Sequence, residues 1–217
     1  MNNVMITILL FLIYSIIGWI IEGIDMLILT KKIVNRGFLI GPYCPIYGFG
    51  ALFIIMVLDK YKSDALVLFV MCVLSCGILE YMTSLIMEKI FKTRWWDYSK
   101  NKFNINGRIC LETLILFGIG GLIISYFINP FIMNIFNLIP NIVLNILAII
   151  FFVIFIIDVI VSCKVIISFK NTISNVRKDS TDEIKKKVKE FLKSKSKLVN
   201  RLANAFPNYE LKLRKKN

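Results

Sequence analysis

The sequence predicts an all-α integral membrane protein with about five transmembrane helices, and three observations lead to that fold class. Of its 217 residues, 57% are hydrophobic, and the mean hydropathy is +0.72, whereas soluble domains contain about 45–50% apolar residues. Several apolar runs are about 20 residues long, which is the length that crosses a bilayer as a helix. These runs are continuous rather than alternating, which favours helices over membrane-spanning strands.

The first predicted span covers residues 4–29, and three basic residues follow it. The second apolar run, 36–58, is long enough to cross the membrane, but its first half is rich in glycine and proline. Proline removes a backbone donor and clashes with the preceding helical turn. We therefore expect a broken or re-entrant start to the second helix, with regular helix from about residue 46. Irregular backbone at membrane depth is stable only where protein buries it or water lines it.

The third predicted span covers residues 65–90, after a short polar link. The fourth covers residues 109–128, and Asn129 and Pro130 are expected to end it. The following segment, up to residue 141, carries no charge. We expect it to lie along the membrane interface.

The fifth predicted span, residues 142–169, completes a transmembrane helical domain over residues 1–170. The remainder, 171–217, is predicted to be a cytoplasmic basic tail. Ser180 and Glu183 fit the capping box that begins a helix. Apolar residues then recur at helical spacing among lysines, namely Ile184, Val188, Phe191, Leu192, Val199, Leu202 and Phe206. We expect a C-terminal basic amphipathic helix on the membrane surface; docking on a partner helix, or self-association, is the alternative.

Charge placement predicts the orientation of the chain. The net charge is +13, and from Lys170 onward there are 15 Lys and Arg against 5 Asp and Glu. Such a tail suits the anionic lipids of the inner leaflet, and nothing in the sequence resembles a nucleic-acid-binding module. Because Lys and Arg are enriched on the cytoplasmic side, the C-terminus and the loop 89–108 are expected inside. The uncharged segment 129–141 and the N-terminus are expected outside.

The composition also excludes several kinds of site. Histidine is absent, which removes the commonest general base and metal ligand. The five cysteines are odd in number and lack paired spacing, which argues against a disulfide framework. Cys72 and Cys76 lie four residues apart, and we interpret them as small apolar residues rather than a metal site. No cofactor and no metal are expected, and no catalytic residue is assigned.

The predicted topology gathers the polar residues of the spans at the cytoplasmic side. They come from four spans and their inner loops, and they are Trp19, Glu22, Asp25, Arg36, Glu80, Tyr81, Ser84, Glu88, Arg108 and Glu112. Glu80, Ser84 and Glu88 share one helical stripe, and Arg108 can pair with Glu112 four residues on. A carboxylate within hydrocarbon is costly unless it is paired, protonated or hydrated. The loop RWWDYSKNKFNINGR, 94–108, is therefore expected to form a wall of a polar site.

A structural role is the alternative for each of these residues taken singly. A buried ion network can fix the register of packed helices, and Trp95 and Trp96 can serve as interfacial anchors. For the cluster as a whole we favour a functional site, because polar residues within spans usually mark a pathway or a binding site. Asp158 and Lys164 make a weaker case, since they are six residues apart and do not share a face.

Five motifs carry a family resemblance: GWxxE at residues 18–22, NRGFLIGPYCPIYGFGA at 35–51, LEYMTSLIME at 79–88, WWDYS at 95–99 and FNINGRICLE at 103–112. Together they resemble the bacterial family of putative ABC-transporter type IV permeases, over about residues 15–115. The resemblance implies a multi-pass permease of the bacterial cell membrane that works with a separate ATPase. It implies substrate-binding residues at Glu22, Arg36, Tyr47, Glu80, Tyr81, Ser84, Glu88, Trp96, Asp97, Tyr98, Asn104, Arg108 and Glu112. It implies a structural loop with Gly41, Pro42, Cys44, Pro45, Gly48 and Gly107.

The resulting functional hypothesis is a permease-like protein that binds a small polar or anionic substrate, or an ion, at the cytoplasmic-side cluster. The sequence has no G-x-x-x-x-G-K-[ST] loop, so ATP hydrolysis would require another subunit. Five spans give no inverted repeat within one chain, so a homodimer or another partner is expected. One alternative is a membrane enzyme or lipid-binding protein, with Arg36 and Arg108 holding a phosphorylated lipid head group. Another is a scaffold that recruits a cytoplasmic protein through its tail.

Overall fold

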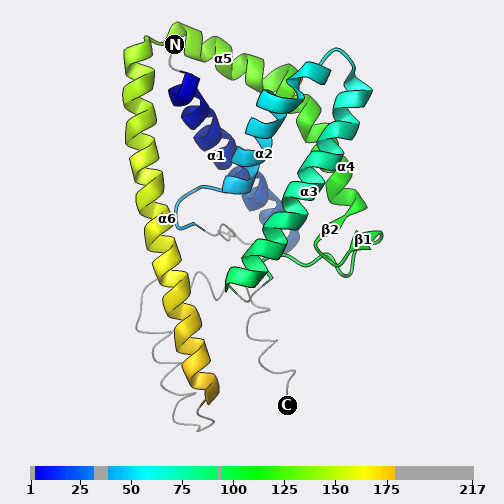
Figure 1. Cartoon of the computed structure of the whole chain (residues 1–217), viewed down its shortest axis with the longest axis vertical. Helices are drawn as coiled ribbons and strands as arrows, with labels where there is room; N and C mark the ends of the chain where they lie inside the picture. Colours follow the sequence, from blue (N-terminus) through cyan, green and yellow to red (C-terminus); the bar gives the residue numbers. More distant parts are fainter. Residues whose placement is uncertain (1–2, 32–38, 92–93, 179–217) are drawn as a thin grey trace. The chain divides into compact units, whose positions relative to one another are not determined.

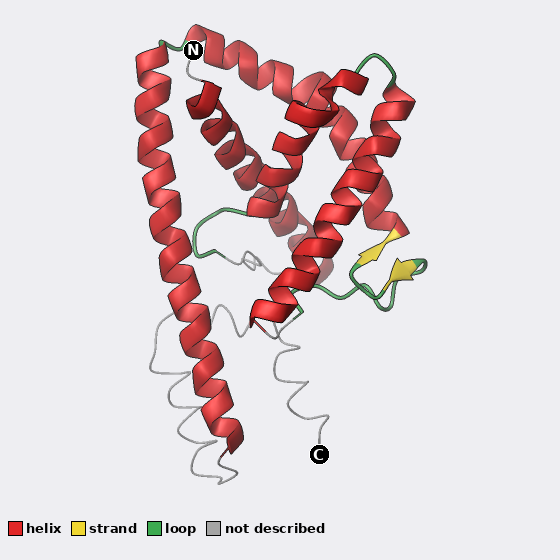
Figure 2. Ribbon diagram, viewed as in Figure 1, coloured by secondary structure: helices red, strands yellow, loops and turns green. Residues whose placement is uncertain are grey.

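A computed structural model describes residues 3–31, 39–91 and 94–178, and it is almost entirely helical (Figures 1 and 2). Four segments are long and apolar enough to cross a membrane: Asn3–Ile28, Ala65–Ile90, Leu111–Leu138 and Asn141–Lys164. These segments confirm the predicted class, an all-α integral membrane protein. The amphipathic helix expected in the tail lies outside the described residues.

The elements follow one another in a simple order. The long helices are α1 (Asn3–Thr30), α3 (Ala65–Phe91) and α6 (Asn141–Lys178). Shorter helical segments are α2 (Pro45–Phe53), the π-helix η1 (Ile54–Leu58), the 3-10 turn η2 (Asp59–Tyr61), α4 (Leu111–Ile123), the π-helix η3 (Ile124–Ile128) and α5 (Asn129–Leu138). Two short strands, β1 (Asn104–Ile105) and β2 (Ile109–Cys110), lie between α3 and α4.

The chain divides into two units, which are described separately. The first contains Met1–Gly18 and Cys44–Ile154, and the second contains Trp19–Tyr43 and Phe155–Asn217. Helices α1 and α6 each contribute to both units.

The second predicted span begins where the sequence indicates, with Pro45 in the first turn of α2. Proline is tolerated there because the first turn has no intrahelical partner for its missing N–H. The helical run from α2 through η1 and η2 covers residues 45–61, which is 17 residues or about 25 Å at 1.5 Å per residue. A bilayer core is about 30 Å thick. The run is therefore shorter than the other four, and it accounts for the difference between five predicted spans and four long apolar helices.

The predicted end of the fourth span is wrong. Helical backbone continues from α4 through η3 into α5 and ends at Leu138, so one segment covers Leu111–Leu138. Pro130 lies in the first turn of α5, where its missing N–H is harmless. Figure 1 shows α5 running in a different direction from α4. The break predicted at Asn129 is thus a change of helix type and direction rather than an end.

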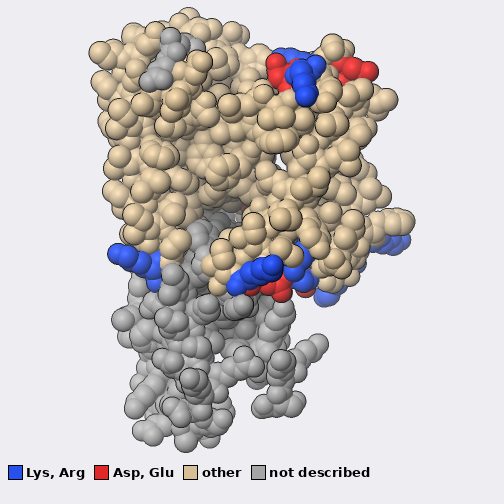
Figure 3. Space-filling model, in the orientation of Figure 1, with Lys and Arg blue, Asp and Glu red and all other residues tan. Residues whose placement is uncertain are grey.

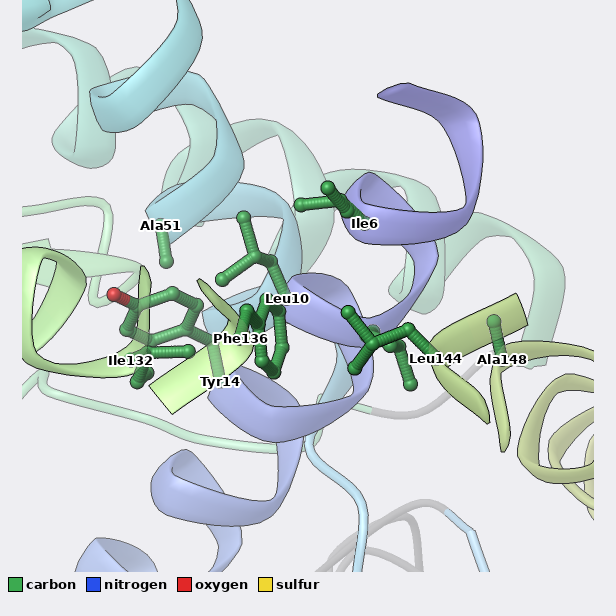
Figure 4. Packing of buried hydrophobic residues seen from close by; sticks show 9 residues of the cluster. Ile6, Leu10, Tyr14, Ala51, Ile132, Phe136, Leu144 and Ala148 are labelled. Carbon is green, nitrogen blue, oxygen red and sulfur yellow. The ribbon is translucent and has the colours of Figure 1, made fainter. Parts of the chain in front are cut away.

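A buried cluster of the first unit joins α1 to three other helices (Figure 4). Its members are Ile6, Leu9, Leu10 and Tyr14 of α1, Ala51 of α2, Ile132 and Phe136 of α5, and Leu144 and Ala148 of α6. Glycine allows α2 to approach α1 closely, since a Cβ on Gly48 would lie 2.6 Å from the backbone oxygen of Phe11. Small residues at helix contacts are the usual means of close packing in membranes.

Helices α3 and α4 pack along their length in the same way. A Cβ on Gly118 would overlap the ring of Phe69, and one on Gly121 would overlap the side chain of Cys72. Figure 3 shows charged side chains over the α2–α3 turn and over the far end of α3, with an uncharged surface between them. This pairing of helices places the α3–α4 loop at one charged end of α3.

Candidate functional site

The α3–α4 loop is a small hairpin held by the turn chemistry of Asn106 and Gly107. Strands β1 and β2 are antiparallel, with Ile105 opposite Ile109. Asn106 and Gly107 have φ of 53° and 65°, and the Arg108 N–H donates to the Ile105 carbonyl at 3.0 Å. Two positive φ values in succession are what an Asn-Gly hairpin turn requires. The sequence Asn-Gly therefore fixes the position of the arginine that follows it.

Gly107 is required by space as well as by backbone conformation. A Cβ on Gly107 would lie 2.6 Å from the Asp97 Oδ1 and 3.0 Å from the Arg94 NH1. The Gly107 carbonyl also accepts a 2.8 Å hydrogen bond from the Tyr98 N–H. The hairpin turn thus packs directly against the first residues of the loop. The structural role expected for Gly107 stays a prediction.

Arg108 reaches from the hairpin to α3 and contacts three of its residues. Its NH2 lies 2.8 Å from the Glu88 Oε2, and its NH1 donates to the Ser84 Oγ at 3.1 Å. The guanidinium carbon lies 5.7 Å from the centroid of the Tyr81 ring. The Arg108 side chain is 12% exposed. Arginine at this position therefore joins the hairpin to α3 by an ion pair, a hydrogen bond and a cation–π contact.

Arg94 approaches the same carboxylate oxygen from the end of α3. Its Nε lies 3.3 Å from the Glu88 Oε2, and its NH1 lies 3.4 Å from the Asp97 Oδ1. The same NH1 donates to the Asn106 carbonyl at 3.2 Å. Two guanidinium groups therefore converge on one oxygen of Glu88.

Glu80 lies deeper along α3 and is 6% exposed. The Tyr98 hydroxyl of the loop donates to its Oε1 at 3.1 Å. The predicted stripe of Glu80, Ser84 and Glu88 is therefore met by the loop along its whole length. We name the hairpin cluster these three residues of α3 together with Arg94, Asp97, Tyr98 and Arg108 of the loop.

Three further residues from the sequence prediction support the hairpin itself. The Trp96 Nε1 donates to the Arg108 carbonyl at 3.0 Å, and the Gly107 N–H donates to the Asn104 Oδ1 at 3.0 Å. The Tyr81 hydroxyl accepts from the Asn106 Nδ2 at 2.9 Å. These contacts orient Arg108 rather than leaving groups directed at a ligand.

Asp97 is the most exposed acid of the cluster, with 46% of its side chain accessible. Its Oδ1 accepts from both the hydroxyl and the N–H of Ser99. The Ser99 hydroxyl, against a smaller opposing effect of burial and with help from the Ser99 N–H and Arg94, holds the pKa of Asp97 below its usual range. Asp97 is therefore an ionised carboxylate at neutral pH.

The pairing of Arg108 with Glu112 that the spacing allows does not occur among the described residues. Arg108 precedes the helix, because α4 begins at Leu111, so helical spacing does not bring the two side chains together. Glu112 is exposed and accepts from the Asn101 Nδ2 at 3.2 Å instead.

The remaining predicted site residues belong to other elements. Tyr47, Cys44, Pro45 and Gly48 belong to the start of α2, where the Tyr47 ring packs on Gly18 and the Cys44 N–H donates to the Ser15 carbonyl at 2.9 Å. Glu22 is half-buried in the part of α1 that belongs to the second unit. Gly41 and Pro42 also belong to that unit, and Arg36 lies outside the described residues. The structure therefore brings together the α3 and loop residues of the prediction.

Sequence reasoning undervalued Asp158 of α6. Within the second unit, its carboxylate accepts from the Ile40 N–H at 3.2 Å and from the Gly41 N–H at 2.9 Å. The Ser162 hydroxyl donates to the same carboxylate at 3.1 Å and accepts from the Ile40 N–H at 3.0 Å. A carboxylate in an apolar span requires donors, and that signal was present in the sequence. Its partners are backbone groups, which no residue pattern reveals.

Chemically, the hairpin cluster combines two guanidinium groups, three carboxylates and a tyrosine hydroxyl at one end of a span. In the described part of the chain, no group of three or more His, Cys, Asp or Glu is placed to hold a metal ion. Guanidinium groups in this arrangement suit a carboxylate or phosphate ligand.

Comparison with known proteins agrees with this architecture. The family described as "Putative ABC-transporter type IV" matches residues 9–163. No curated protein and no solved structure matches the chain. The match extends beyond the 15–115 expected from the motifs, and it includes most of the apolar part of α6. The chain is therefore a membrane protein that belongs to the putative ABC-transporter type IV family.

Proposed function

We propose that the protein is the membrane subunit of a transporter and binds a small polar or anionic substrate, or an ion, at the hairpin cluster. The family and the apolar helices support a transporter-like membrane protein. The observation that carries the site is the convergence of Arg94 and Arg108 on one oxygen of Glu88, at 3.3 and 2.8 Å. A substrate anion offers both guanidinium groups the same partner that Glu88 does.

Glu88 acts in this proposal as an internal competitor for the substrate. Its side chain is 32% exposed, whereas that of Arg108 is 12% exposed, so an anion approaches through the Glu88 and Asp97 end. Binding releases Glu88 from Arg108, and the freed carboxylate is then able to change its hydration or protonation. Glu80, which lies deeper along α3, accepts a hydrogen bond from Tyr98 of the same loop. Movement of the loop would therefore also change the contacts of Glu80.

Energy for transport comes, in this proposal, from a separate ATPase subunit. The chain contains no G-x-x-x-x-G-K-[ST] loop, and such loops are what cradle nucleotide phosphates in these ATPases. Orientation with the loop in the cytoplasm, as the Lys and Arg distribution predicts, would place the hairpin on the side where an ATPase docks.

The test is a titration of three variants in lipid nanodiscs with inorganic phosphate. Tryptophan fluorescence monitors binding of the phosphate. Arg108→Ala should abolish binding. Glu88→Gln should tighten it, because the competing charge is gone. Lys62→Ala is the matched control, since Lys62 pairs with Asp59 in the α2–α3 turn, and it should bind as the native protein does.

Repeating the titration with a short-chain phosphatidic acid separates a free anion from a lipid head group. Binding of the lipid alone would favour the lipid-binding alternative, with the same arginines in the same role. Equal binding by all three variants would remove the proposed site. In cells, Glu80→Gln should abolish transport. The glutamine still offers an amide oxygen that accepts the hydrogen bond from the Tyr98 hydroxyl, so the variant tests the charge of Glu80.

A further inference from the structure

Three buried side-chain oxygens of the first unit have no hydrogen-bond partner among the described residues. They are the Tyr14 Oη, the Ser125 Oγ and the Asn129 Oδ1. The Tyr14 and Ser125 residues are each 2% exposed. Most buried polar atoms in proteins are paired, and each exception requires an explanation. Three exceptions from α1, η3 and α5 make this part of the bundle unusual.

Packing brings these three residues towards one region. Ser125, Asn129 and Ile132 are spaced i, i+4 and i+7, so they share a face. Ile132 is in the same buried cluster as Tyr14. Ile124 and Ile128 of η3, which precede Ser125 and Asn129 in the sequence, pack against that cluster. Figure 4 shows the Tyr14 ring extending from α1 to the side chain of Ile132. The polar face of η3 and α5 is therefore directed to the side of α1 that carries Tyr14.

The backbone is also irregular at this place. Ser125 lies within the π-helix η3, and Asn129 directly follows it. The other π-helix, η1, packs against η3. Single π-helical turns within α-helices are rare and frequently occur at functional sites. Two of them in contact, next to unpaired polar atoms, are a second and independent sign of a binding site.

The Tyr14 hydroxyl is buried away from bulk water. Tyr14 is 11 residues from the start and 14 from the end of the candidate span Asn3–Ile28. Hydrophobic side chains of the buried cluster surround Tyr14. Transfer of an ion from water to apolar surroundings is costly, which favours an uncharged occupant.

We propose that Tyr14, Ser125 and Asn129 form an internal binding site for a small uncharged hydrogen-bonding molecule, of which water is the smallest. Two hydroxyls and one amide offer both donors and acceptors, and a buried water typically makes about three such bonds. The site is distinct from the hairpin cluster and does not depend on the proposed function. It would place a polar binding site inside an otherwise apolar part of the helical bundle.

The sign of a stability change tests this proposal. Tyr14→Phe and Ser125→Ala each remove one oxygen with little change of shape. An occupied site predicts that each variant lowers the Tm in nanodiscs, and that the double variant loses less than the sum, because both oxygens bind the same molecule. Truly unpaired oxygens predict the opposite, since their removal relieves a desolvation penalty and raises the Tm. Either a rise in Tm or fully additive losses would overturn the proposal.

Ser15→Ala calibrates the experiment. Ser15 is 0% exposed, and its hydroxyl already has a partner, the Phe11 carbonyl at 2.7 Å. Ser15→Ala should lower the Tm, and in a double variant its effect on the Tm should add to that of Ser125→Ala. If the two Tm losses are non-additive, hydroxyl-radical footprinting by X-rays identifies the occupant of the site. Oxidation of Tyr14 that is weaker in Ser125→Ala indicates bound water. Non-additive losses without oxidation of Tyr14 indicate another neutral solute.

Discussion

Glu88 and Asp158 are two carboxylates in apolar spans, and the chain accommodates them by different means. Glu88 is held by two arginine side chains at the end of α3. Asp158 is held by two backbone N–H groups and one hydroxyl in the second unit. Side-chain partners can move away and accept another anion, whereas backbone donors at residues 40–41 are fixed by the chain. We therefore expect the contacts of Glu88 to exchange with another anion and those of Asp158 to form a permanent attachment.

The largest effect should come from removing the permanent attachment. Asp158→Leu leaves the Gly41 N–H and the buried Ser162 hydroxyl without their acceptor, whereas the Ile40 N–H keeps the Ser162 oxygen. Each buried group that loses its partner costs about 1–3 kcal/mol. Unfolding free energy in mixed micelles should fall by about 2–6 kcal/mol for this variant. Glu88→Gln should lose about 1 kcal/mol or less, because its contacts are partly exposed. Equal losses in the two variants would contradict the distinction.

A smaller effect should follow from altering the turn that positions Arg108. Gly107→Ala forces a residue with a Cβ into positive φ and against Asp97 and Arg94. Strain of this kind costs about 1–3 kcal/mol. The loss should be confined to the loop, so hydrogen exchange of residues 94–110 should accelerate while that of α1 does not change. Gly120→Ala is the matched control, since nothing lies within 4 Å of a Cβ there.

The smallest effect should be the pH dependence of Asp97. Its pKa is lower in the folded protein than in the unfolded chain, so its contribution to stability is present above the usual Asp pKa. That contribution is lost as the pH falls through the lower, folded value. Because the side chain is 46% exposed, solvent screening keeps the effect small.

Ser99→Ala checks this assignment. The variant removes the hydroxyl that contributes most to the shift, so the folded pKa of Asp97 should move back towards its usual value. Loop stability should then be lower at neutral pH, and it should fall less on acidification than in the native chain. Hydrogen exchange of the loop, measured from neutral to acidic pH, gives both curves. Superimposable curves would show that Ser99 does not hold the carboxylate.

The helical class and much of the site were predictable because they depend on local rules. Apolar runs predict spans, and the spacing of Glu80, Ser84 and Glu88 predicts a shared stripe. The partners of that stripe were less predictable. Arg108 was expected to pair with Glu112, but this requires a helix that begins only at Leu111. Tertiary contact with α3 decides the pairing, and the sequence spacing carries no information about it.

The misplaced end of the fourth span has a similar cause. Asn129 and Pro130 are a strong signal for a helix end, yet Pro130 is in the first turn of a new helix. A π-helix directly before it joins the two segments, and no sequence rule predicts such a turn. Residues 124–129 therefore contain both the error of the sequence prediction and two of the three unpaired oxygens.

The separation along the chain of these contacts sets an order of assembly during synthesis. The hairpin contacts its helix across 18 to 25 residues, from Tyr98 to Glu80 and from Asn106 to Tyr81. These bonds can form soon after Arg108 is made, while the ribosome is still producing α5 and α6. Asp158 meets Gly41 across 117 residues, so the donors at residues 40–41 must wait for most of the chain. A newly made chain can thus complete the hairpin cluster early, whereas the backbone N–H groups of residues 40–41 have no carboxylate partner until α6 has been synthesised.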